Sequence, residues 1–208
     1  MAYDLEEQEQ LDAFKAWWKA YGNIILLAAG VAIASFAGVQ GWKYYQHQQS
    51  LKASVKYVEL TQADPKDSKT IKAISGELME GYASTPYAGR AALTVAKANY
   101  AAKDTKSAKT QLRWAADKAK EEPVRAIALL QLAAIQFEEK DYDAALKTLS
   151  EKHDAGFDGL FADLRGDILA AQNKKAEAKK AYEEALGKLD AQGPYHRFTE
   201  HKLEALGS

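Results

Sequence analysis

The residues whose types allow chemistry are four histidines and several pairs of adjacent acids. No two of the histidines, His47, His153, His196 and His201, have the HExxH spacing that binds zinc on a helix. A catalytic histidine needs an oriented partner, so His196 and His201 are interpreted as surface residues. The acid pairs are interpreted as parts of charged helix faces: Glu121-Glu122, Glu138-Glu139 and Glu183-Glu184.

Other signatures of catalysis and cofactor binding are missing from the sequence. It has no Gly-x-Ser-x-Gly elbow, no GxxxxGK phosphate loop and no GxGxxG. It has no cysteine, which excludes disulfides, thiolate chemistry and a lipid-modified cysteine anchor. The formal net charge is −1, without the strongly basic face of a nucleic-acid binder. We therefore expect no enzyme activity, no cofactor and no metal.

Composition predicts helices throughout the 208 residues. Strong helix formers such as alanine, lysine, glutamate and leucine dominate, and only 4 prolines interrupt them. No run of alternating valine, isoleucine and threonine indicates a strand. The predicted fold class is all-α, with one N-terminal transmembrane helix followed by a solenoid of tetratricopeptide-like helical hairpins.

The N-terminal part carries the signature of a membrane anchor. Residues 24–39 read IILLAAGVAIASFAGV, and no charged residue lies between Lys19 and Lys43. Such a stretch is long enough to span a bilayer. A transmembrane helix is predicted over 22–45, rather than a buried core helix, because aromatic side chains lie at both edges. They are Trp17, Trp18 and Tyr21 before it, and Trp42, Tyr44 and Tyr45 after it.

The tail at 1–21 is long and acidic, which argues against a cleaved signal peptide. Lysines flank the span almost equally and lean slightly toward a cytoplasmic domain, so charge alone does not orient the protein. Within the span, Gly30, Ala34 and Gly38 recur every four residues and share one face. This face either packs against another transmembrane helix or reflects the general abundance of small residues in such helices.

The remaining sequence divides into a helical connector with a partial first repeat (46–87) and three hairpins with a C-terminal capping helix (88–208). A helix end is expected at Asp64-Pro65. Corresponding positions repeat at steps of 37 and then 33 residues, against about 34 in tetratricopeptide repeats. Small residues are expected where the two helices of each hairpin touch: Ala96 and Ala108, Ala133 and Ala145, Gly166 and Ala178. A large residue follows four positions later: Leu112, Leu149 and Tyr182.

The sequence resembles the YfgM family, the ancillary subunits of the bacterial SecYEG translocon. The resemblance covers nearly the whole chain. It rests on the acidic start before an uncleaved anchor and on four short stretches. These are residues 84–88 (STPYA), 111–114 (QLRW), 156–157 (GF) and 160–167 (LFADLRGD).

This resemblance implies a single-pass protein of the inner membrane, with a cytoplasmic N-terminus and a periplasmic repeat domain. It also implies two partners, the SecYEG translocon and a membrane-anchored periplasmic chaperone of the PpiD type. The implied role is that of a non-enzymatic adaptor that links newly exported proteins to periplasmic chaperones. Two other functions remain open, a general periplasmic holdase and a membrane-anchored cytoplasmic scaffold.

Stacked hairpins present a concave face on which a partner can bind. The repeat frame points nine residues of the first helices into it: Leu93, Lys97, Tyr100, Ile127, Leu130, Phe137, Leu160, Asp163 and Asp167. The alternative is that the final helix or neighbouring repeats cover these side chains, since aromatic residues at helical spacing are usually core. Trp114 lies on a second helix and is compatible with a core position or an exposed interface.

Overall fold

The computed structural model describes residues 2–207, and their side chains from residue 7 onward. The chain divides into two compact units, 1–48 and 49–208, which are described separately. The helices are α1 (Ala2–Gln62), α2 (Ser68–Gly81), α3 (Pro86–Ala101), α4 (Thr105–Lys118), α5 (Glu122–Glu138), α6 (Tyr142–Leu149), the 3-10 helix η1 (Ala155–Phe157), α7 (Asp158–Ala171), α8 (Lys175–Leu186) and α9 (Pro194–Gly207). The predicted all-α class is confirmed, because the described residues contain no strand.

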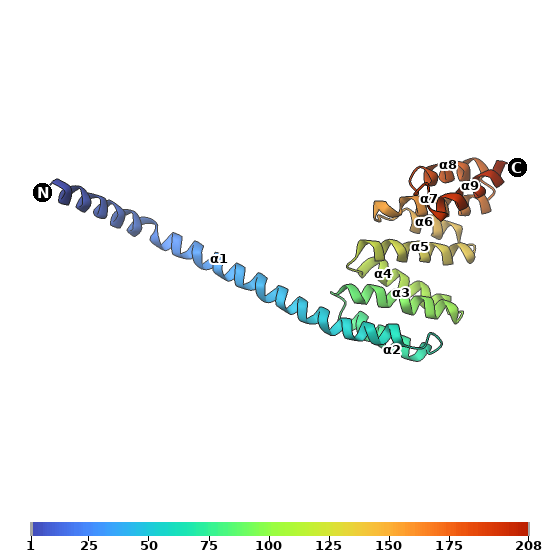
Figure 1. The fold of residues 1–208 in the computed structure, drawn as a ribbon, viewed down its shortest axis with the longest axis horizontal. Helices are drawn as coiled ribbons and strands as arrows, with labels where there is room; N and C mark the ends of the chain where they lie inside the picture. Colours follow the sequence, from blue (N-terminus) through green and yellow to red (C-terminus); the bar gives the residue numbers. More distant parts are fainter. Residues whose placement is uncertain (1, 208) are drawn as a thin grey trace. The chain divides into compact units, whose positions relative to one another are not determined.

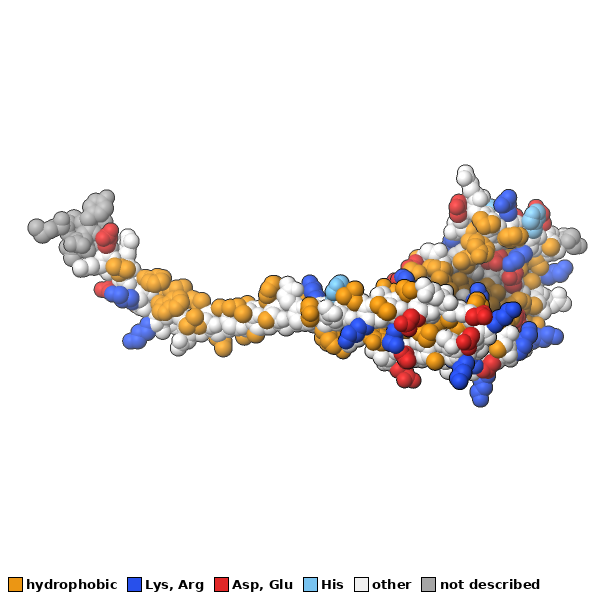
Figure 2. Space-filling model, turned by 60° about the horizontal axis from the view of Figure 1, so that its bottom comes forward, with side chains coloured by type: hydrophobic (Ala, Val, Ile, Leu, Met, Phe, Trp, Pro, Cys, Tyr) orange, Lys and Arg blue, Asp and Glu red, His pale blue; other side chains and the backbone are white. Residues whose placement is uncertain are grey.

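The helix α1 contains one stretch that is long and apolar enough to cross a membrane. Hydrophobic side chains line its visible surface (Figure 2), and Leu27 and Ile33 are about 70 % exposed. A helix that leaves such side chains uncovered is suited to lipid rather than to water. Among the flanking aromatic residues, the rings of Trp17 and Tyr21 lie 6.0 Å apart and those of Trp42 and Tyr45 lie 5.9 Å apart.

In the unit 49–208 the helices follow one another as a stack of antiparallel pairs (Figure 1). The helix α1 ends at Gln62, just before the expected break at Asp64-Pro65. Pro86 is the first residue of α3, and Pro123 lies in the first turn of α5, where proline lacks only a hydrogen bond that the helix does not form.

Each hairpin turns through a residue in the left-handed conformation. The φ angles of Lys103, Lys140 and Asn173 are 63°, 62° and 65°. In each turn the next backbone N–H donates to a carbonyl five residues earlier, as from Asp104 to Asn99 at 2.9 Å. These bonds satisfy helix-end carbonyls in a Schellman motif.

A side-chain cap then starts the second helix of a pair. Asp67, Asp104 and Asp141 recur 37 residues apart, and each accepts a hydrogen bond from the backbone N–H three residues on. In the third hairpin the corresponding residue is Lys174, which makes no side-chain cap. The cap is therefore the feature in which α8 departs from α2, α4 and α6.

The expected contacts between paired helices are confirmed. The five small alanines and Gly166 are buried, as are the large residues Leu112, Leu149 and Tyr182. A Cβ atom on Gly166 would overlap the Tyr182 ring, so only glycine fits there. In the other two hairpins the alanine pairs allow the two helices to approach closely. The larger residues Leu112 and Leu149 then fill the space beside that contact.

The end of α1 supplies the first helix of the stack. Ala53 and Leu60 are buried together with Ile71 and Leu78 of α2. A salt bridge joins Lys56 of α1 to Glu77 of α2. The ring centroids of Tyr57 and Tyr87 lie 5.5 Å apart, and both contacts support this packing. Residues 49–62 therefore belong to the repeat unit, although they continue the helix that begins as the anchor.

Candidate functional site

The candidate site is a groove between α3 and α5, which we call the α3–α5 groove. It has a volume of about 380 Å³. Its sides are formed by Lys97 and Tyr100 of α3 and by Gln131, Ala134 and Glu138 of α5, over a floor of Ala96, Leu112 and Ile135. The volume falls within the range of about 300–1,000 Å³ typical of ligand sites.

Polar groups stand at one rim of this groove. The Tyr100 hydroxyl donates to the Glu138 carboxylate, and this hydrogen bond raises the pKa of the Tyr100 phenol above its usual value. Lys97 and Gln131 are exposed. The α3–α5 groove thus combines an apolar floor with a cation, an amide and a phenol bound to a carboxylate at its edges, which suits a peptide with apolar side chains.

The other predicted residues of α3 and α5 are more covered. Leu93 is half-buried against the core of the first hairpin, and Leu130 and Phe137 are half-buried against that of the second. The Phe137 ring lies 6.0 Å from that of Tyr142. Ile127 is half-buried as well. These four residues therefore contribute mainly to packing, and the open part of the predicted surface is narrower than the sequence indicated.

The final helix binds two of the three predicted residues of α7, Asp163 and Asp167, which is the alternative that the sequence left open for them. Thr199 and Lys202 of α9 reach Asp163, with distances of 2.8 and 2.7 Å, and Lys202 also contacts Asp167 at 2.8 Å. Leu160 is half-buried. Because α9 packs beside α7 and α8, it covers this end of the concave face.

This cluster shifts the ionisation of its members. Burial opposes the charge on Lys202, but the hydrogen bonds to Asp163 and Asp167 outweigh it and raise the pKa of the lysine. Burial also raises the pKa of Tyr182, whose hydroxyl donates to Asp167 at 2.8 Å. Lys202 thus stays protonated around neutral pH, and its contacts with Asp163 and Asp167 fasten α9 to α7.

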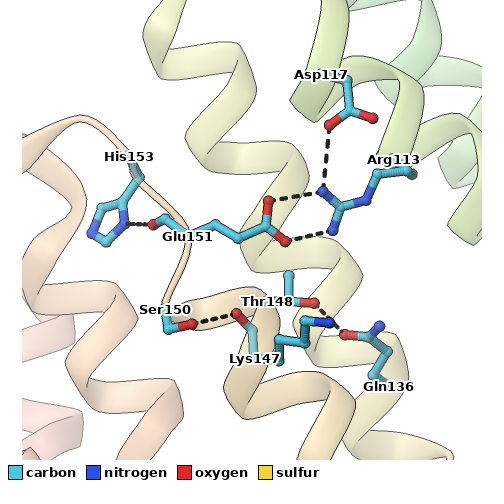
Figure 3. Close-up of polar contacts among 8 residues, drawn as sticks. All are labelled: Arg113, Asp117, Gln136, Lys147, Thr148, Ser150, Glu151 and His153. Carbon is cyan, nitrogen blue, oxygen red and sulfur yellow. Dashed lines mark hydrogen bonds and ion pairs between the residues drawn. The ribbon is translucent and has the colours of Figure 1, made fainter.

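A second polar network joins the hairpins on the side of α4 and α6 (Figure 3). Arg113 donates two hydrogen bonds, of 2.8 and 2.7 Å, to Glu151, which directly follows α6 and its cap, and it lies 3.4 Å from Asp117. The His153 ring contacts the Glu151 carbonyl at 2.8 Å and stacks on Phe161. This network fixes the first hairpin on the second and positions the loop before α7.

The acid pairs lie on charged and largely exposed helix faces, and members of each pair also bind residues of neighbouring helices. Glu121 binds Arg90 through two hydrogen bonds, and Glu139 pairs with Lys109. Glu184 lies 3.1 Å from Arg165. Sequence alone did not show this, because the partners lie 19 to 31 residues away.

The structure offers no metal site among its described residues. The His196 and His201 rings lie 3.6 and 3.5 Å from Glu200 and Glu204 of the same helix. Within α1, Gly30 and Gly38 have open space around them, and Ala34 is exposed on the same helix. Their role as a packing face for another transmembrane helix stays a prediction.

The chain is similar to characterised bacterial proteins over nearly its whole length. A family model described as a tetratricopeptide repeat-like domain matches residues 15–208. A Haemophilus influenzae protein named ancillary SecYEG translocon subunit is 31 % identical over 89 % of this chain and 91 % of its own length. A Neisseria gonorrhoeae protein of that name is 31 % identical over 99 % and 100 %. The Escherichia coli protein of that name is 26 % identical over 85 % of both chains.

Proposed function

Because this chain belongs to the tetratricopeptide repeat-like family of ancillary SecYEG translocon subunits, we propose that it is a membrane-anchored adaptor at the translocon. The anchor is the apolar stretch of α1, which suits a single-pass protein of the inner membrane. Relatives of this kind are named for a non-catalytic role, in agreement with the absence of catalytic motifs from this sequence. The repeat unit then faces the periplasm, where exported chains emerge.

The α3–α5 groove is the single observation that carries the adaptor role. It is an open hollow with an apolar floor on a rigid stack of helices, and α9 leaves it uncovered while it closes the α7 end. We propose that it holds a segment of a periplasmic chaperone of the PpiD type, so that this chaperone stays close to emerging chains. The transmembrane helix supplies the contact with SecYEG.

Topology is the first test. Full-length protein with a C-terminal tag is expected to lose the tag to protease once the outer membrane alone is permeabilised, while a cytoplasmic control protein survives. A tag that survives in the wild type and in a destabilised variant places the repeats in the cytoplasm. The chain would then be a cytoplasmic scaffold, and the proposed function would be wrong.

Partner capture is the second test. Purification in mild detergent should recover SecYEG components and the chaperone together. Tyr100→Ala should lose most of the chaperone but keep SecYEG, whereas the matched control Tyr195→Ala, which alters a tyrosine that is 58 % exposed on α9, should lose neither. Recovery of neither partner with the wild type, together with suppression of client aggregation by the protein alone, would instead indicate a general holdase.

A further inference from the structure

A second hollow lies between α2 and α4, over α3, and has a volume of about 420 Å³. We call it the α2–α4 notch. The residues used here are Gly76 and Met79 of α2, Asn99 of α3, and Gln111 and Trp114 of α4. It shares no lining residue with the α3–α5 groove, so it is a separate feature of the repeat unit.

Asn99 is the unusual residue of this notch. Its side chain is only 2 % exposed, and its carbonyl oxygen accepts no hydrogen bond from any described residue. A buried acceptor without a partner destabilises the folded state, so such groups are uncommon in proteins and call for an explanation.

The corresponding position has no unpaired acceptor among the described residues of the second and third hairpins. Counted from the left-handed turn residue, Asn99 and Gln111 correspond to Gln136 and Thr148 in the second hairpin. There the Thr148 hydroxyl donates to the carbonyl oxygen of the half-buried Gln136 side chain at 2.8 Å, which satisfies this acceptor (Figure 3). In the third hairpin the same two positions are Leu169 and Ala181, which are buried in an apolar cluster.

The remaining walls of the notch indicate the chemistry of its ligand. Met79 and the half-buried Trp114 supply apolar surface. A Cβ atom on Gly76 would meet nothing within 4 Å, so this glycine leaves the hollow open. Lys72 and Glu80 give the rim one charge of each sign, which favours a neutral ligand over an anion or a cation.

We infer that the α2–α4 notch binds a short extended peptide segment of another protein. A backbone N–H of that segment donates to Asn99, and a neighbouring apolar side chain lies against Trp114 and Met79. Gln111 offers its amide to the peptide carbonyls. This site is additional to the α3–α5 groove, and it does not depend on which partner that groove holds.

Fluorine NMR on the full-length protein in detergent micelles tests this inference. All four tryptophans carry 5-fluorotryptophan, and Trp114→Phe identifies the signal of Trp114. The probe is the capped peptide acetyl-Ala-Leu-Ala-amide. It should shift the Trp114 signal to saturation and leave those of Trp17, Trp18 and Trp42 in place. The same peptide with methylated backbone nitrogens should bind at least about tenfold more weakly, since a site built for a donor rejects a ligand without one.

Two variants sharpen this experiment. Gly76→Leu should abolish the shift by filling the notch, whereas its matched control Gly81→Leu, also with open space around it on α2, should leave the shift unchanged. Asn99→Leu introduces the residue found at position 169 and should weaken binding about tenfold. Thermal melts of each variant check that the repeat unit remains folded.

The inference is wrong if the Trp114 signal stays still up to the solubility limit of the peptide. It is equally wrong if the methylated peptide binds as well, or if Gly76→Leu retains the shift. Movement of all four tryptophan signals together would show partition of the peptide into the micelle and would also count against the site. None of these outcomes bears on SecYEG or chaperone recovery, so this inference and the proposed function fail independently.

Discussion

The first hairpin (α3 and α4) and the third (α7 and α8) have equivalent positions, but these positions are open in the first hairpin and filled in the third. The first keeps polar groups beside two open hollows: the Asn99 carbonyl oxygen, which accepts no hydrogen bond from the described residues, and Tyr100 at a groove rim. The third fills the corresponding space with Leu169 and Tyr182 and is closed by α9.

This difference separates binding from stability along one stack. In a linear repeat each hairpin contacts chiefly its neighbours, so a terminal hairpin can be sealed without closing the others. The third hairpin has the tight Gly166–Tyr182 contact and the ion cluster of α9. The first has space. Substitutions in the Gly166–Tyr182 contact or in the ion cluster of α9 should therefore lower the free energy of unfolding. Substitutions in the first hairpin should mainly change ligand binding.

The largest effect is expected at the Gly166–Tyr182 contact. Gly166→Ala places a Cβ atom inside the Tyr182 ring and should destabilise the protein by about 1–3 kcal/mol. Urea unfolding followed by circular dichroism measures it. Adding Tyr182→Leu recreates the alanine and leucine of the second hairpin and should recover part of the loss. Equal losses in both backgrounds would show that the contact is not the cause.

The next effect is expected at Lys202. Lys202→Ala leaves Asp163 and Asp167 without their shared cation and should cost about 1–2 kcal/mol, a value reduced for its 35 % exposed side chain. Lys179→Ala, which removes an exposed lysine 3.9 Å from Glu183, should change stability by less than about 0.5 kcal/mol. If both variants lose similar stability, the ion pairs of Lys202 do not fasten α9 to the third hairpin.

The pH dependence of the Lys202 contribution has a definite sign. The folded pKa of this lysine lies above its ordinary value of 10.5, so its protonated form is stabilised by folding. The contribution is complete below pH 10.5 and is lost as the pH rises through the folded value. The stability difference between wild type and Lys202→Ala should therefore be constant near neutral pH and shrink in strong alkali.

The helix caps should give smaller changes of opposite sign in the two hairpins. Asp104→Ala removes a cap and should lower the melting temperature by about 2–4 °C, whereas Lys174→Asp should raise it by a similar amount. Hydrogen bonds from Ser107 lower the pKa of Asp104. Its contribution is therefore present above its ordinary pKa and is lost as the pH falls through the lowered value.

Asp104→Asn is the control for charge, because asparagine also caps helices. It should keep most of the melting temperature at neutral pH and lose the acid dependence. If Lys174→Asp does not stabilise the protein, the missing cap is not a weakness of the third hairpin.

The smallest effects are expected in the turns. Lys103→Gly relieves a left-handed lysine and should stabilise the protein by about 0.5–1 kcal/mol. Asn173→Gly should gain less, because asparagine tolerates this conformation better. Lys180→Gly, inside α8, should lose about 1 kcal/mol. Chemical unfolding gives all three values, and an equal gain at both turns would contradict this reading of the backbone.

Much of the fold was predictable, because local rules set it. The apolar run of α1, the break before Pro65 and the small residues between paired helices follow from periodicity and side-chain volume. The candidate site was less predictable. The repeat frame placed Lys97 and Tyr100 at the groove, but it could not show that α9 covers Asp163 and Asp167, since that contact joins residues 35 to 39 positions apart.

The sequence by itself determined that this protein has an apolar anchor and a helical repeat unit without catalytic motifs. These are properties of local composition and spacing. Only the tertiary structure decided which hollows stay open and which acids connect helices. It also decided that no described residue donates a hydrogen bond to the Asn99 side-chain oxygen, whereas Thr148 donates one to Gln136. The physical reason is that burial and hydrogen bonding depend on groups brought together from distant positions, and each such group appears in the sequence as an ordinary helix residue.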